Sequence, residues 1–165
     1  MDSRSKAKIW AKNAERLKKR IRHIKAPVGM IGSKAKKETK FKQGWREFGG
    51  KRIFYRSKWE ANFGRFLQWQ KEQGLIKEWL HEPQTFWFEG VRRGCVTYLP
   101  DFKVTYQDDR HEWVEVKGWM DPKSKTKISR FRKYFPKESL RIVGSTWYKS
   151  NNHKLSVLIP GWEKG

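Results

Sequence analysis

The alternation of apolar and polar residues predicts a change of structure after Gly49-Gly50. Lys51 to Tyr55 has the two-residue period of a short strand, and Lys58 to about Gln73 has the apolar period of a helix. Ser57 is a favourable N-cap for this helix, and Gly74 is a favourable terminator. This helix is therefore the first fixed element of a compact domain.

An acid lies on the buried stripe of this helix. The stripe consists of Phe63, Phe66, Leu67 and Gln70. Glu60 precedes Phe63 by about one helical turn, so it faces the same side. Ser57-X-X-Glu60 is also a capping box, in which the glutamate bonds back to a backbone amide. Two interpretations of Glu60 stay open, a helix cap and a functional carboxylate.

Five short segments after the helix have the composition of strands. Breaks rich in Gly, Pro and Asp separate them, as in an antiparallel meander. The predicted strands are Trp79–Leu80, Phe86–Phe88, Cys95–Leu99, Phe102–Tyr106 and Trp113–Lys117.

The last of these strands carries an acid and a lysine on one face. Glu115 and Lys117 are two residues apart, so they point the same way, about 6 to 7 Å apart along the strand. Val114 and Val116 face the other side.

Pro100 fits only an edge or the start of a strand, because proline has no N–H for a central ladder. Asp101 therefore lies where the sheet opens, and it can reach the side of Glu115.

Three further elements are expected towards the end of the chain. They are a helix over Pro122–Tyr134 with Ile128 and Phe131 inward, a core strand over Leu140–Gly144 and a terminal strand over Val157–Trp162. The helix carries Lys123, Lys125, Lys127, Arg130, Arg132 and Lys133. These cations form either a solvated face or a set of phosphate contacts.

The first part of the chain is a basic arm. Residues 1–43 contain fifteen Lys or Arg and three acids, a net charge of +12. Apolar residues at helical spacing form a narrow seam of Trp10, Ala14, Leu17, Ile21 and Ile24. Two interpretations stay open: the seam only docks on the compact domain or a partner subunit, or the opposite face, with Lys18, Lys19, Arg20 and Arg22, also follows a phosphate backbone. Val28 to Gly50 lacks periodicity and predicts a flexible basic linker.

Composition narrows the class of protein. The 165 residues carry a formal net charge of +22, and ten Trp, ten Phe and five Tyr supply a core. A polyanion such as nucleic acid is the expected partner. Cys95 is the only cysteine, which excludes an intrachain disulfide and a Cys-rich zinc site. Without a secretory or membrane-spanning pattern, we expect a cytoplasmic, intracellular protein with no membrane partner.

The two acids and the lysine suit the hydrolysis of phosphodiester bonds. Asp101 and Glu115 can hold one Mg²⁺ through their carboxylates. The backbone carbonyl of Val116 can serve as a third ligand from the protein. Lys117 can orient or acidify the attacking water and balance charge in the transition state. Taken alone, an acid-X-Lys strand is usually a solvated face, so the order of all three fragments carries the interpretation.

These fragments resemble the PD-(D/E)XK nuclease superfamily. Pro100-Asp101 matches its PD element, Glu115-Val116-Lys117 matches its (D/E)XK element, and Glu60 matches an acid that many members carry on the first core helix. Arg56 to Lys117 looks most like phage junction-resolving endonucleases, with their Ser-X-X-Glu, Pro-Asp-Phe and Glu-X-Lys-Gly segments. The chain is also similar to transposon end-cleaving nucleases and to small phage proteins of the same fold. The resemblance covers roughly residues 50–145.

The resemblance implies a catalytic set of Glu60, Asp101, Glu115 and Lys117. Asp101 and Glu115 would bind Mg²⁺, with Mn²⁺ as a substitute, and Glu60 would touch a second ion or its waters. Some relatives place a Gln-Pro pair before the Pro-Asp element, whereas this chain has Glu82-Pro83-Gln84, so Gln84 is a suggested site residue only. We assign no catalysis to the four histidines, which are too far apart for a local ligand motif.

We therefore expect an α/β PD-(D/E)XK core, residues 44–165, with a mixed central β-sheet flanked by helices and a basic helical arm and linker, residues 1–43. The expected activity is Mg²⁺-dependent endonucleolytic cleavage of DNA, selective for branched or distorted duplex. The alternatives are a sequence-specific nuclease of the homing or transposon-end type and a non-catalytic basic nucleic-acid-binding protein. A homodimer, and a phage enzyme acting in a bacterial host, are compatible with the sequence.

Overall fold

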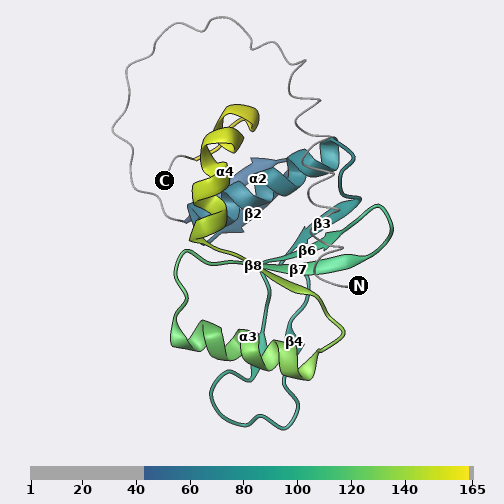
Figure 1. Ribbon diagram of the computed structural model, residues 1–165, viewed down its shortest axis with the longest axis vertical. Helices are drawn as coiled ribbons and strands as arrows, with labels where there is room; N and C mark the ends of the chain where they lie inside the picture. Colours follow the sequence, from purple (N-terminus) through teal and green to yellow (C-terminus); the bar gives the residue numbers. More distant parts are fainter. Residues whose placement is uncertain (1–42, 164–165) are drawn as a thin grey trace, which may run out of the picture. The chain divides into compact units, whose positions relative to one another are not determined.

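The computed structural model describes residues 43–163, which belong to one unit, Phe41–Gly165 (Figure 1). In order along the described residues, its elements are β1 Gly44–Phe48, β2 Lys51–Tyr55, α2 Lys58–Glu72, β3 Glu78–His81, β4 Phe86–Trp87, β5 Thr97–Tyr98, β6 Phe102–Thr105, β7 His111–Val116, α3 Pro122–Tyr134, β8 Leu140–Val143 and α4 Ser145–Leu158. The predicted apolar seam from Trp10 to Ile24 and the arm cations Lys18, Lys19, Arg20 and Arg22 lie outside the described residues.

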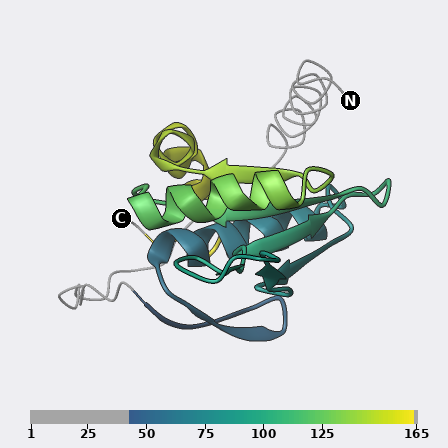
Figure 2. The same cartoon turned by 90° about the horizontal axis from the view of Figure 1, so that it is seen from below.

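A mixed sheet of four strands lies at the centre, in the order β3-β6-β7-β8. The first three strands run antiparallel to their neighbours, and β8 runs parallel to β7. Helices α2 and α4 cover one face of the sheet and α3 covers the other (Figures 1 and 2). The expected α/β architecture with a mixed central sheet flanked by helices is confirmed.

The alternation along β7 separates two hydrophobic cores. Val114 and Val116 belong to the larger core, which the sheet forms with α2 and α4. Trp113 points to the opposite face and packs with Phe131 of α3 in the smaller core. The period of two therefore fixes which β7 side chains reach each layer, as the sequence predicts.

The first two described helices begin and end close to their predicted bounds. Ser57 caps α2 by accepting a hydrogen bond from the Glu60 N–H, and the chain leaves the helix through Gly74, with φ at +65°. Helix α3 begins at Pro122 behind the N-cap Asp121. None of the helices in residues 43–163 is long and apolar enough to cross a membrane.

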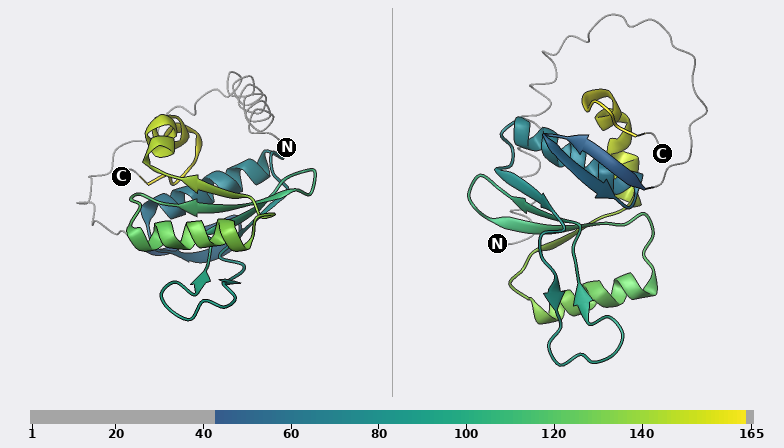
Figure 3. Two further views of the ribbon diagram at one scale, coloured as in Figure 1. Left: turned by 60° about the horizontal axis from the view of Figure 1, so that its bottom comes forward. Right: turned by 180° about the vertical axis from the view of Figure 1, so that it is seen from behind.

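The prediction of a linker extending to Gly50 is wrong over its last residues. Gly44–Phe48 is strand β1, which pairs antiparallel with β2. Gly49 and Gly50 have φ of +59° and +70° and form the two-residue turn between the strands, a conformation that favours glycine at both positions. The glycine pair is thus a hairpin turn, and the hairpin lies across α2 (Figure 3, right).

The prediction of one antiparallel meander is also wrong. Strand β3 pairs directly with β6, so β4 and β5 are absent from the central sheet. These two strands pair only with each other among the described residues, and Phe86 and Tyr98 pack against Phe131 of α3. Short strand patterns predict extended backbone but not which strand is the partner, because pairing depends on contacts distant in sequence.

The predicted terminal strand over Val157–Trp162 is not formed. Val157 and Leu158 close helix α4, and Trp162 follows it. Tyr148, Leu155 and Ile159 face the larger core at helical spacing, whereas Val157 is exposed. The apolar residues at the end of this segment continue a helical stripe rather than a strand.

Gly64 of α2 allows the β1–β2 hairpin to approach the helix. A Cβ at this position would lie 2.6 Å from the Tyr55 hydroxyl and 3.1 Å from the Phe48 ring. Tyr55 is fully buried and has no room to withdraw. We expect Gly64→Ala to lower the free energy of unfolding by about 1 to 3 kcal/mol through overpacking, despite the better helix propensity of alanine.

Urea denaturation measures this loss. Gly118→Ala is the matched control, because a Cβ there meets only the Trp59 ring at an ordinary 3.7 Å. An equal effect of the two substitutions would show that the hairpin yields at Gly64.

Candidate functional site

Glu115 and Lys117 meet at the end of β7. Glu115 is 4% exposed, and its Oε1 lies 2.8 Å from Lys117 Nζ. Its Oε2 accepts a buried hydrogen bond of 2.8 Å from the Tyr98 hydroxyl. The strand therefore presents a carboxylate that two neighbouring groups hold in one position.

Both partners of Glu115 are held in their protonated forms. Burial, and then the charge of Glu115, raise the pKa of Tyr98 well above its usual range, so the phenol remains a donor. Burial lowers the pKa of Lys117, but the charge and hydrogen bond of Glu115 outweigh it and raise the pKa overall. Lys117 is therefore an ammonium ion in contact with a buried carboxylate.

Pro100 explains how Asp101 joins this site. The antiparallel register of β6 and β7 ends at the pair Phe102–Val114, so Pro100 lies just beyond the last paired residue. If the register continued, Pro100 would fall opposite Val116. Proline has no N–H to donate to the Val116 carbonyl. The Val116 N–H instead donates a 2.7 Å hydrogen bond to Asp101 Oδ2. The proline at the start of the strand thus opens the ladder and lets the Asp101 carboxylate bind beside it.

The negative charges of Asp101 and Glu115 repel each other. Asp101 is 7% exposed, and burial followed by the charge of Glu115 raises its pKa to about 8. The Val116 N–H and Lys117 lower the pKa, while the charge of Glu60 adds to the rise. Two buried carboxylates in this arrangement favour a cation between or beside them.

This pKa predicts a pH-dependent stability. Asp101 is protonated in the folded state up to about pH 8, but an unfolded Asp ionises near pH 4. Without divalent cations, the contribution of Asp101 to the free energy of unfolding is therefore expected to be fully present below about pH 4 and to be lost as the pH rises to about 8.

Urea denaturation in EDTA across this range measures the effect. Asp101→Asn retains an acceptor for the Val116 N–H and is expected to flatten the pH dependence. An unchanged slope in the variant would contradict the raised pKa of Asp101.

Glu60 lies in the first turn of α2, and this residue is only 4% exposed. Its N–H donates to Ser57 Oγ at 3.1 Å, which is the first half of a capping box. Its carboxylate accepts from the N–H of Arg56, the residue before the N-cap, and its Oε1 lies 2.6 Å from His81 Nε2. The carboxylate thus joins the helix to β3 and does more than close the cap.

His81 and Glu82 also belong to this region, and the sequence interpretation missed them. Together with Glu60 they offer three ligand atoms that all lie within 4.8 Å of one another. His81 packs against Tyr55 and Phe102, and Glu82 pairs with Arg56 at 2.6 Å. Adjacent His-Glu before a proline is the only local signal for this cluster, and the contact with Glu60 depends on the fold.

The proposed phosphate contacts on α3 have different surroundings. Lys123 and Lys125 are exposed and Lys127 is half-buried. Arg130 instead donates to the carbonyls of Cys95 and Arg93, at 2.6 and 3.5 Å. Its guanidinium therefore holds the loop between β4 and β5 against the helix.

The suggested site residue Gln84 and the nearby Trp119 are both exposed. Gln84 lies after Pro83 on the surface, and Trp119, two residues beyond Lys117, is 76% exposed. Trp119 therefore does not cap the core. Comparison with known proteins found no matching family model, curated protein or solved structure.

Proposed function

We propose that this chain is a metal-dependent endonuclease of the PD-(D/E)XK type that hydrolyses DNA phosphodiester bonds. The observation that carries the proposal is the burial of the Asp101 and Glu115 carboxylates beside the Lys117 ammonium, where the β6–β7 ladder opens at Pro100. A buried acid of raised pKa, here Asp101, together with a second buried acid and a lysine is typical of catalytic sites rather than of solvated strands.

The residues present fit a hard divalent cation. Asp101 and Glu115 supply two carboxylates, and Val116, whose N–H binds Asp101, can add its backbone carbonyl as a third oxygen. Oxygen ligands of this kind suit Mg²⁺, and a bound cation would offset the burial and the Glu115 charge that raise the pKa of Asp101. These three residues would hold the ion, and Glu60 would touch a second ion or its waters.

His81 is consistent with Mn²⁺ as a substitute. Its Nε2 lies beside the Glu60 carboxylate, and imidazole nitrogen binds Mn²⁺ more readily than Mg²⁺. Activity is therefore expected with either metal.

The metal would supply Lewis-acid stabilisation of the phosphate and a water of lowered pKa. The protein residues would position and balance this chemistry. Tyr98 fixes Glu115, and the Val116 N–H fixes Asp101, so both carboxylates are preorganised. Lys117 keeps its proton and presents a positive charge to the phosphate as negative charge develops there.

The charge of the chain supports a polyanionic substrate. Residues 44–165 carry a net charge of +10 in addition to the +12 of residues 1–43. DNA is attracted to such a surface through its phosphates, independently of base sequence. The resemblance to junction-resolving endonucleases favours branched duplex over linear duplex, and a homodimer would allow paired cuts.

A panel of substrates tests the proposal. The purified full chain is incubated with equal-length linear duplex, flap, four-way junction and single strand, in Mg²⁺, Mn²⁺ or EDTA, and the products are mapped. We expect cuts in the flap and the junction with either metal and none in EDTA. Binding without cleavage of any substrate would favour the non-catalytic nucleic-acid-binding alternative. Cuts at one site in a long random duplex would favour a sequence-specific nuclease.

A further inference from the structure

The outer face of the β1–β2 hairpin carries two large exposed aromatic side chains. Trp45 is 59% exposed and Phe54 is 41% exposed. They are partners in the strand register, and their rings are in edge-to-face contact with centroids 5.6 Å apart. The Arg52 guanidinium lies 5.2 Å from the Trp45 ring centroid. We call these three residues the hairpin aromatic surface.

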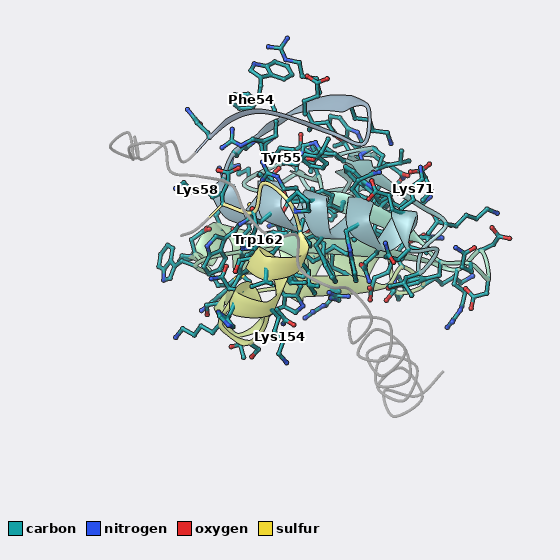
Figure 4. All side chains as sticks on the ribbon, turned by 90° about the horizontal axis from the view of Figure 1, so that it is seen from above. Phe54, Tyr55, Lys58, Lys71, Lys154 and Trp162 are labelled. Atoms are coloured by element: carbon teal, nitrogen blue, oxygen red, sulfur yellow. The ribbon has the colours of Figure 1, made fainter. Side chains whose placement is uncertain are left out.

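Neither hydrophobic core formed by residues 43–163 includes Trp45 or Phe54. The inner face of the hairpin packs on the larger core through Phe48, Ile53 and Tyr55. Figure 4 shows Tyr55 between the hairpin and α2, and Phe54 on the outer side. An adjacent pair of exposed aromatic rings that contributes little to the core is typical of an interaction site.

Strand β2, which carries Phe54, leads directly to the candidate functional site. Phe54 directly precedes Tyr55, whose ring centroid lies 4.9 Å from that of His81. Two residues after Phe54, the Arg56 N–H donates to Glu60. A nucleic acid bound at the acidic site is therefore within reach of the hairpin.

We propose that the hairpin aromatic surface stacks on unpaired bases of the substrate. This inference deepens the proposed function, on which it rests for nucleic acid as the ligand. Aromatic rings and an arginine over one of them form the kind of platform that stacks single-stranded bases without reading their sequence. Within a duplex, neighbouring bases already cover these faces, so the surface would recognise the unpaired part of a branched DNA.

Charge favours this occupant over a second copy of the chain. Residues 44–56 contain four Lys or Arg and one acid, and the whole chain carries +22. Two such surfaces repel each other, whereas a phosphate backbone is attracted to both the hairpin and the chain.

Binding assays without cleavage test the inference. Fluorescence anisotropy in EDTA measures the Kd of the full chain for labelled single strand, flap and matched linear duplex. Trp45→Ala and Phe54→Ala are each expected to weaken binding to single strand and flap about tenfold and to leave duplex binding within about twofold. Trp45→Phe should restore most of the affinity. Trp87→Ala, which removes a 70% exposed Trp of β4, is the matched control and should change little.

Three results would overturn the inference. They are no loss of single-strand affinity, an equal loss on duplex, or a change from dimer to monomer in sedimentation of Trp45→Ala, which would make the surface an interface between copies. Because the assay needs no cleavage, its failure is distinguishable from failure of the nuclease proposal. Inactivity of the wild-type chain on every substrate would contradict the nuclease but would leave this comparison of Kd values intact.

Discussion

Asp101→Asn and Glu115→Gln are each expected to lower the rate of DNA cleavage by about three orders of magnitude. Each substitution removes one ligand charge and almost no volume from a buried site. The new asparagine would still accept from the Val116 N–H, and the new glutamine would still accept from the Tyr98 hydroxyl, so the strands keep their local bonds. Single-turnover cleavage of a four-way junction in Mg²⁺ measures the rate, and anisotropy in EDTA measures binding.

A matched substitution separates the site from the general loss of an acid. Glu89→Gln changes the net charge equally at an exposed loop position and should cut like the wild type. Junction affinity should stay within about twofold in all three variants, because their phosphate contacts are unchanged. Wild-type cleavage by either site variant would refute the assignment of Asp101 and Glu115 as metal ligands.

The parts of the site that lie on one strand were predictable from the sequence. The period of two in β7 places Glu115 and Lys117 together and opposite to Val114. The missing N–H of proline predicts that the ladder opens beside Asp101, and the 2.7 Å bond to Val116 shows how. Both inferences need only backbone geometry, which local sequence determines strongly.

The parts that depend on distant contacts were not predictable. His81 reaches Glu60 because β3 pairs with β6 and skips two strands, a choice that no local pattern encodes. The β1–β2 hairpin was missed because Gly49-Gly50 indicates a domain boundary as readily as a turn. The exposed Trp45 and Phe54 became recognisable only once the inner face of that hairpin was known.

Glu60→Gln is expected to reduce cleavage about a hundredfold without a comparable loss of stability. Glutamine can still accept from the Arg56 N–H and form a hydrogen bond with the His81 ring, so the contacts between α2 and β3 persist. It lacks the negative charge that a metal or its water shell would sense. The melting temperature should therefore change by less than about 2 °C, while single-turnover cleavage falls.

Ser57→Ala provides the opposite control for Glu60. It removes the hydroxyl that accepts from the Glu60 N–H, which costs about 1 kcal/mol of stability, and it leaves the carboxylate in place. We expect this variant to melt earlier and to cut normally per folded molecule. If Glu60→Gln instead lost stability and kept its cleavage rate, Glu60 would act only as a helix cap. Because each substitution should change one measurement and spare the other, the pair decides whether the proposed cleavage depends on the hydrogen bonds of Glu60 or on its charge.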